Sequence, residues 1–210
     1  MRANTAIGEI GISLGDRDYL LRPSFKALSA LGTPRQLVEL FAFVHGGPRF
    51  HPMLPKFNHA EANRHFRACC DVIAACCDDD VSPLLGTPGE RWGSWRPGAM
   101  RVRDAAILAQ SLLKHGMIGV VPPVAAAPGT PPPVASEEFD PAEYVALAVA
   151  HLGMAEGDAW ALTMTSFVLY TRAKYPPPKS NAPSEAEHDH VMGWLAQINA
   201  IRDGAPNDGQ

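Results

Sequence analysis

Histidine and cysteine side chains, which are common ligands of zinc, gather in one stretch of the sequence. His65 and Cys69 are four residues apart in a segment with helical periodicity, so they share a face of the helix and could contact one metal ion. Further candidate ligands are near in sequence: His59, Cys70, Cys76 and Cys77. Adjacent cysteines on a helix point about 100° apart, however, and the Cys-x-x-Cys knuckle of zinc sites is absent. Because free cysteine is a common small core residue, we expect core packing here and no metal or other cofactor.

Three other groups of residues carry charged or turn-forming chemistry without the partners that a site needs. The carboxylates of residues 78–80 have no further ligands at the spacing of a calcium loop. His188 and His190 are two residues apart and so lie on different faces of a helix. The turn at residues 86–89 lacks the Lys-Ser/Thr pair of a phosphate loop, and neither G-x-S-x-G nor HExxH occurs. We therefore expect a protein that is not an enzyme.

The composition of the chain limits both the class of partner that it can bind and the cellular compartment that we expect for it. The chain has 210 residues, of which 46% are hydrophobic, and a net charge of −4. This charge argues against nucleic acid, whose phosphates need a basic surface. No run of about 18 apolar residues predicts a membrane span, and the N-terminus lacks the apolar core of a signal peptide. We expect a cytoplasmic protein. The cysteines are consistent with this location. The pairs Cys69-Cys70 and Cys76-Cys77 are roughly 10 Å apart along one helix, which is too far for a disulfide between the pairs.

The elements that must position these residues begin with a β-hairpin. A β-branched run over residues 7–14, turn residues at 15–18 and an apolar return over 19–22 predict it. Four helices are predicted to follow, each with an apolar stripe and with start or stop signals. They cover residues 24–31, 34–44, 58–78 and 100–115, with Thr33 to Gln36 as a capping box, Gly116 as a stop and a loop over 82–97.

Proline and alanine dominate residues 119–137, the clearest composition shift in the chain. Such a segment is typical of an extended linker. We therefore predict a mainly α fold with a small N-terminal β-hairpin and two helical modules joined by this Pro/Ala-rich linker. The hairpin and first module would span residues 1–118, the second module 138–203, and a disordered tail 204–210. The second module would begin with a capping box at Asp140 to Glu143 and end with a helix that starts near Ser184.

A stretch at residues 151–178 organises the second module. It predicts a short helix over 155–162, a break at 163–165, and a second helix that three prolines end at 176–178. Thr165 is the expected cap of that second helix. The buried stripe is expected to contain Met164, Phe167, Val168, Thr171 and Tyr175, with Trp160 beside it.

So many short helices, with loop tryptophans, offer more apolar surface than one compact core absorbs. Exposed apolar patches on such a chain mark partner sites, which favours binding over catalysis. The expected partner-binding anchors in the second module are Trp160, Met164, Phe167 and Trp194, with Phe41 and Val44 as secondary candidates. Each of these side chains has core packing as its alternative role.

Two segments carry a family resemblance. Residues 7–32, with Arg22-Pro-Ser-Phe-Lys-Ala-Leu28 inside them, resemble the opening of tail assembly chaperones of long-tailed bacteriophages and prophages. Residues 152–165, which contain Leu152-Gly, an acidic pair, Trp160 and Met164-Thr165, resemble a later segment of the same proteins. The resemblance implies a non-enzymatic protein in the cytoplasm of the bacterial host cell. Its partners would be the phage tape measure protein and also the tail tube protein.

Two alternatives stay open. The linker and extra helices are additions to the simplest chaperones, and they leave room for a virion structural protein, such as a head–tail connector or minor tail protein. A metal-binding enzyme or regulator built on His65 and the cysteines is the weaker alternative.

Overall fold

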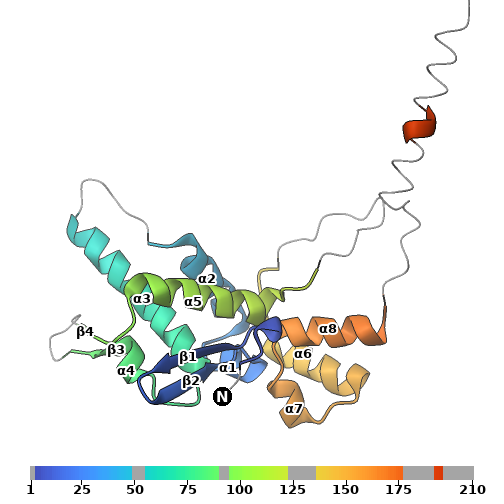
Figure 1. Ribbon diagram of the computed structural model, residues 1–210, viewed down its shortest axis with the longest axis horizontal. Coiled ribbons are helices and arrows are strands. Elements are labelled where there is room, and N and C mark those ends of the chain that lie inside the picture. The colour runs from blue at the N-terminus through green and yellow to red at the C-terminus, as the bar shows by residue number, and fades with distance from the viewer. Residues whose placement is uncertain (1–2, 49–54, 90–94, 123–135, 177–191, 196–210) are drawn as a thin grey trace, which may run out of the picture. The chain divides into compact units, whose positions relative to one another are not determined.

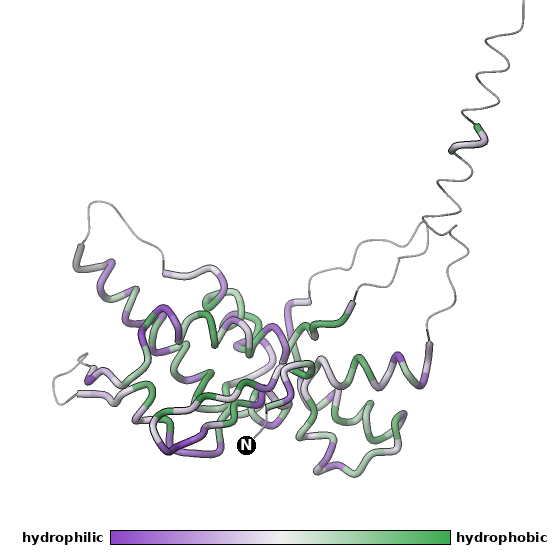
Figure 2. Tube along the Cα trace, in the orientation of Figure 1, coloured by the Kyte–Doolittle hydropathy of each residue, from purple (hydrophilic) through white to green (hydrophobic). Residues whose placement is uncertain are grey.

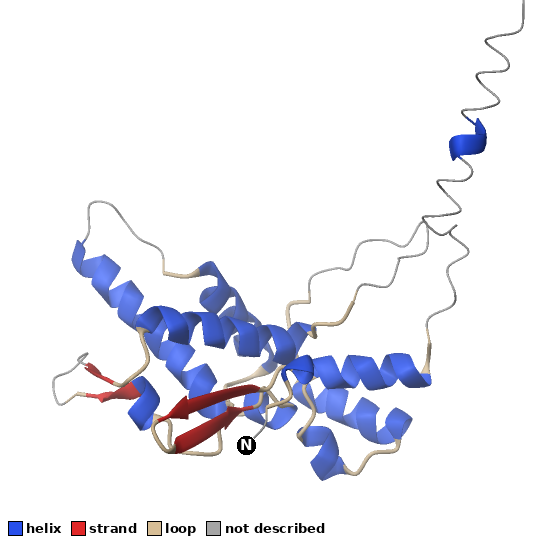
Figure 3. Ribbon diagram, viewed as in Figure 1, coloured by secondary structure: helices blue, strands red, loops and turns tan. Residues whose placement is uncertain are grey.

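The computed structural model describes residues 3–48, 55–89, 95–122, 136–176 and 192–195. Helices dominate these residues, and two small antiparallel hairpins accompany them, as Figure 3 shows. The predicted fold class, mainly α with an N-terminal β-hairpin, is confirmed. The predicted final helix beyond Ser184 and the tail at 204–210 lie outside the described residues, apart from a helical segment at 192–195.

The first hairpin forms where the sequence predicted it, after a short 3₁₀ helix, η1 (Thr5–Ile7). Strand β1 (Ile10–Leu14) pairs antiparallel with β2 (Arg17–Leu21), so that Ile10 lies opposite Leu21 and Leu14 opposite Arg17. The side chain of Leu21 is fully buried, which anchors one face of the hairpin in the core.

The next helices begin at side-chain caps that the sequence encodes. Ser24 caps α1 (Phe25–Ser29) by accepting a hydrogen bond from the backbone N–H of Ala27. Thr33 and Gln36 form the predicted capping box at the start of α2 (Pro34–Gly46). Both caps satisfy donors that the first helical turn leaves open.

The longest helices pack side by side and build the core. Helix α3 (Pro55–Ala75) lies along α5 (Val102–Leu113), and α2 contacts both of them (Figure 1). The core side chains between these elements are fully buried; they include Leu37, Val44, Val72, Ile73, Leu112 and Leu113.

The predicted loop at residues 82–97 is wrong in part, because it contains short elements. They are α4 (Ser82–Leu85) and the strands β3 (Gly86–Pro88) and β4 (Trp95–Pro97), which pair with each other. The indole Nε1 of Trp95 donates to the carbonyl of Leu85 at 2.9 Å, and its ring packs edge-on against Phe66. Three-residue strands are too short to leave a periodic pattern in the sequence.

Gly116 does not end the fourth helix as predicted. The chain continues as a π-helix, η2 (Lys114–Ile118), and stops at Gly119, whose φ is +81°. Gly116 is buried, and a Cβ there would lie 3.1–3.2 Å from atoms of Leu28 and Pro23. Its missing side chain therefore lets η2 approach the start of α1 closely.

The segment after residue 136 folds into four short helices. They are α6 (Pro141–Leu147), the π-helix η3 (Ala148–Leu152), α7 (Glu156–Trp160) and α8 (Met164–Lys174). Asp140 caps α6 through the backbone N–H of Ala142. The predicted cap of α8 is wrong: Thr163 accepts from the N–H of Ser166 at 3.1 Å, whereas Thr165 already lies inside the helix.

Helices on both sides of the predicted linker share one core. The ring of Phe25 stacks on Tyr144 at 5.7 Å between centroids and meets Phe167 edge-on at 6.1 Å. The backbone N–H of Phe25 donates to the carbonyl of Leu162 at 2.8 Å. The described residues of 1–122 and 133–176 form one compact unit. The ranges 123–132 and 177–210 form a second unit, of which the structure describes the helical residues 192–195.

Among the helices that the structure describes, none combines the length and the apolar character that crossing a bilayer requires.

Phe25→Ala tests whether the shared core is energetically important. Phe25 is fully buried and contacts rings on both sides of the predicted linker, so its truncation should lower the free energy of unfolding by about 3–5 kcal/mol. Urea unfolding followed by circular dichroism measures this. The matched control is Val102→Ala at a 57% exposed position, which should cost less than about 0.5 kcal/mol. Equal small effects of the two substitutions would contradict the shared core.

Candidate binding groove

An open groove lies between α6–η3 on one side and α8 on the other. It encloses about 600 Å³. Its walls are mainly apolar, and they consist of Leu147, His151, Leu152, Phe167, Thr171 and Tyr175; we call this feature the groove. All of these residues belong to the unit formed by residues 1–122 and 133–176.

Helical spacing explains why these side chains face each other. Leu147 and His151 are one turn apart on α6–η3, and Phe167, Thr171 and Tyr175 follow successive turns along α8 and its end. The two walls run in the same direction. At one end the ring of Tyr144 meets Phe167 at 5.5 Å, and at the other the ammonium of Lys174 donates to the backbone carbonyl of His151. Helix α7 carries the chain from the end of η3 back to the start of α8 (Figure 1).

An aromatic cluster closes the N-terminal end of the groove. Its members are Phe25, Phe139, Tyr144 and Phe167, with centroid distances from 5.3 to 6.1 Å between contacting rings. Stacked and edge-on rings at these distances attract one another beyond the effect of burial. The groove is therefore closed by packed rings at this end and is open at its mouth, by which we mean the ends of η3 and α8.

Large apolar side chains remain exposed along the groove and beside it. Leu147 is 41% exposed, and Tyr175 is 53% exposed. Val149, Leu169 and Tyr170 on the same helices are also exposed. Figure 2 shows hydrophobic residues along both helices that form the walls. Exposed apolar side chains are unfavourable in water, and those of Leu147 and Tyr175 in the groove mark a site that a partner covers.

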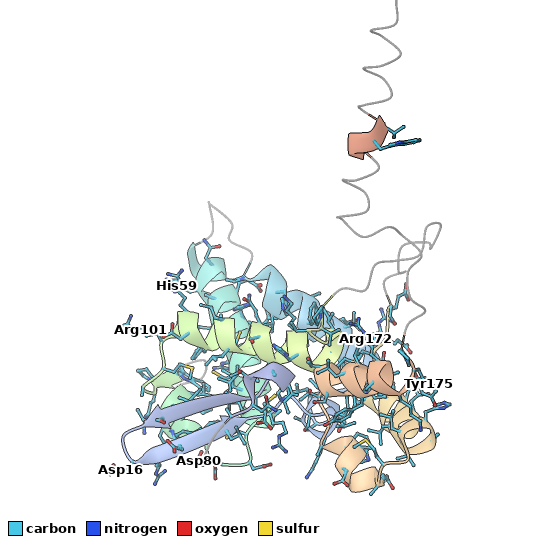
Figure 4. The ribbon with its side chains drawn as sticks, turned by 45° about the vertical axis from the view of Figure 1, so that its right-hand side comes forward. Asp16, His59, Asp80, Arg101, Arg172 and Tyr175 are labelled. Atoms are coloured by element: carbon cyan, nitrogen blue, oxygen red, sulfur yellow. The ribbon has the colours of Figure 1, made fainter. Side chains whose placement is uncertain are left out.

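Basic side chains gather at the mouth. Lys174 follows Thr171 by one turn, and Arg172 donates through Nη1 to the carbonyl of Pro122 at 2.6 Å. Figure 4 labels Arg172 on α8 and Tyr175 just after the end of that helix. The side chain of Arg172 is half-buried, whereas Lys174 and His151 are exposed.

A buried polar network fixes the start of α8. The hydroxyl of Thr165 accepts from the N–H of Val120 at 3.0 Å, lies 3.0 Å from Nδ1 of His115 and donates to the His115 carbonyl at 3.2 Å. Beside it, Thr163 donates to the carbonyl of Ile7 at 2.9 Å. Burial and the neighbouring charge of Lys114 lower the pKa of His115 from its ordinary value. These contacts hold the groove helix against η1 and η2.

The structure places only one of the predicted α7–α8 anchors in the groove. Phe167 is half-buried and forms part of a wall. Met164 is 3% exposed and belongs to the core, and the half-buried Trp160 donates through Nε1 to Glu156 at 3.4 Å. Trp194, at 57% exposed, belongs to the helical residues 192–195 of the other unit.

The secondary candidates lie on α2, away from the residues that form the groove. Val44 is fully buried in the core. Phe41 is half-buried, and its ring stacks on His45 at 4.0 Å between centroids. Neither residue forms part of the groove.

Sequence reasoning missed the α6–η3 wall, although it placed a helix there. The signal was present, since Leu147 and His151 share a face at a spacing of four residues. Thr171 and Tyr175 were assigned to a buried stripe, and the structure leaves Thr171 half-buried and Tyr175 exposed in the groove. Periodicity locates a stripe along a helix but not the part of it that a neighbour covers.

His65 and Cys69 contact each other within the core. Since a carbonyl can only accept, Nε2 of His65 donates to Val44 at 3.1 Å, which leaves Nδ1 to accept from the Cys69 thiol at 3.8 Å. Burial raises the pKa of Cys69 to about 11, so the thiol is neutral at ordinary pH. Within the described ranges, no three His, Cys, Asp or Glu side chains lie close enough together to hold a metal ion.

Residues 21–190 match a family of unknown function, DUF6246. The chain belongs to this family. The DUF6246 match begins at Leu21, the last residue of β2, and includes every described helix from α1 to α8 and therefore both walls of the groove. Neither a curated protein nor a solved structure matches the chain.

The His115 network predicts a loss of stability in mild acid. Because burial lowers the pKa of folded His115 below its ordinary 6.5, the unfolded chain binds the proton more readily, and stability falls as the pH drops through and below that value. Replacing the imidazole with the neutral amide in His115→Asn should reduce this pH dependence. Urea unfolding of both proteins at about pH 7.5 and about pH 5 measures the difference. Identical pH dependence in the two proteins would contradict the assignment.

Thiol labelling tests the burial of the cysteines. Cys69, Cys70 and Cys76 are buried, and burial raises the pKa of Cys76 to about 12, so these thiols should not react in the folded protein. Cys77 is half-buried and should react slowly. A chromogenic disulfide reagent should therefore detect one thiol in native protein and all four in urea. Rapid native labelling of two or more thiols would contradict the packing of α3.

Proposed function

We propose that this protein is a non-enzymatic tail assembly chaperone of a phage or prophage that binds a helical segment of the tape measure protein in the groove. In this role it would shield apolar helices of the tape measure protein in the host cytoplasm before the tail tube encloses them. The observation that carries the proposal is the exposed apolar groove between α6–η3 and α8.

The dimensions of the groove suit a helix better than an extended peptide. Its wall along α8 extends over nine residues, from Phe167 to Tyr175 at the end of the helix, which is eight steps or about 12 Å at the rise of a helix. Two consecutive turns of an amphipathic helix present apolar side chains over a similar length. The helices that form the walls have their backbone groups bonded internally, so no open strand edge is offered for β-pairing.

The two segments that resemble tail assembly chaperones contain residues that form or support the groove. Residues 152–165, which carry the second part of that resemblance, contain Leu152 of one wall, helix α7 and the first two residues of α8. This segment turns the chain so that both walls run in the same direction. The first part of the resemblance contains Phe25, which supports Tyr144 and Phe167 in the aromatic cluster.

A charged residue in the groove should weaken partner binding while the fold survives. Leu147→Asp places a carboxylate at a 41% exposed position in the apolar wall, and it should weaken binding of a tape measure fragment by about tenfold or more. The matched control is Ile107→Asp on α5, a 55% exposed position outside the groove, which should bind as the wild type does. Titration calorimetry with the fragment measures both affinities.

Co-expression and particle analysis separate the chaperone from a virion component. A chaperone should raise the soluble yield of the tape measure protein and be absent from purified particles, whereas a connector or minor tail protein should be found in them by mass spectrometry. Unchanged tape measure solubility, or wild-type affinity of Leu147→Asp, would count against the proposal.

A further inference from the structure

We infer that the groove selects a partner helix that carries a carboxylate at the end of its apolar face, and that this carboxylate pairs with Lys174 and His151 at the mouth. The inference rests on the proposed helix-binding function and specifies the chemistry of the partner. It also gives the bound helix a direction, because the cationic side chain of Lys174 lies at only one end of the groove.

Lys174 holds hydrogen-bond donors ready at the mouth. Its ammonium donates to the backbone carbonyl of His151, and its Nζ lies 5.8 Å from the ring centroid of Tyr175. An ammonium carries three N–H donors, so this bond leaves two of them for a ligand. The contact with His151 places those donors beside the groove wall instead of leaving the long side chain free in solvent.

The side chain of His151 supplies a second donor on the groove wall. It forms part of the groove wall and is exposed, and its ring has no hydrogen-bond partner within the described part of the chain. A neutral imidazole still offers one N–H, and the protonated ring offers two. Together with Lys174 it can therefore donate to both oxygens of one carboxylate.

The positive charge at the mouth has no internal counter-charge among the described residues. Arg172 donates to the carbonyl of Pro122 and Lys174 to that of His151, and neither forms an ion pair with a described carboxylate. The C-terminal poles of the two helices contribute about half a negative charge each, which is less than the two full charges of Arg172 and Lys174. The mouth is thus locally positive in a chain whose net charge is −4.

The opposite end of the groove has no basic side chain among its lining residues. It is closed by the aromatic cluster, where Tyr144 and Phe167 meet, and the charge that acts on Tyr144 there is the carboxylate of Glu143, which would repel an acidic residue. A bound helix would therefore place its apolar residues over Leu147 and Phe167 and its acidic residue near Lys174. The matching pattern is two apolar residues one turn apart, with Asp or Glu one turn further on the same face.

Two synthetic helical peptides test the inference directly. Both carry leucines one turn apart on one face, and they differ only in the next residue on that face, which is Glu in one and Lys in the other. Fluorescence anisotropy with the full chain at low salt should show about fivefold or more tighter binding of the Glu peptide. Lys174→Glu should reverse this preference. Lys26→Glu on α1 makes the same change in net charge outside the groove, and it should leave the preference unchanged.

The outcomes separate the inference from the proposed function. Equal affinity for both peptides, with binding lost in Leu147→Asp, would overturn the carboxylate preference and leave the apolar groove intact. If Lys174→Glu still prefers the Glu peptide, the inference is also overturned, because residues other than Lys174 would then recognise the carboxylate of the peptide. Saturable binding of neither peptide would overturn both the inference and the groove as a helix-binding site.

Discussion

The packing of Phe25 against Tyr144 and Phe167 is the contact on which the rest of this structure depends. Phe25 follows the N-terminal hairpin directly, while the two rings that it contacts lie on α6 and α8, more than a hundred residues later in the chain. Its backbone N–H also donates to the carbonyl of Leu162. One residue thus joins the hairpin, the core and both helices of the groove.

Hydrogen bonds, together with the aromatic cluster, hold helix α8 in place. Thr163 and Thr165 bind the start of α8 to Ile7, His115 and Val120, so this helix is held at its N-terminal end by buried hydrogen bonds. Its C-terminal end is held by Arg172 on the Pro122 carbonyl and by the exposed side chain of Lys174 on the His151 carbonyl. The groove consequently joins an aromatic end that packs into the core to a mouth with exposed side chains. Such a site leaves apolar surface exposed to water, which is unfavourable. Covering that surface with a partner is favourable and drives binding.

Local signals predicted most of the fold, and long-range contacts account for what they missed. The hairpin, the capping box at Thr33 and the chain break before α8 depend on neighbouring residues and could be predicted from the sequence. The choice of Thr163 over Thr165 as a cap could not, because the side chain of Thr165 is taken by His115, which lies 50 residues away. Gly116 has a stop signal in sequence, yet its contact with Pro23 gives it a packing role. The groove itself escaped prediction for the same reason, since exposure at Leu147 and Tyr175 is decided by which neighbours are present.

Hydrogen–deuterium exchange of the full chain, alone and in complex with a tape measure fragment, tests the central claim that the groove is the partner site. The account predicts added protection in residues 144–152 and 167–175, with α5 unchanged as an internal reference. Protection confined to other elements, such as α2 and α5, or a complex that forms without protecting either wall of the groove, would contradict it.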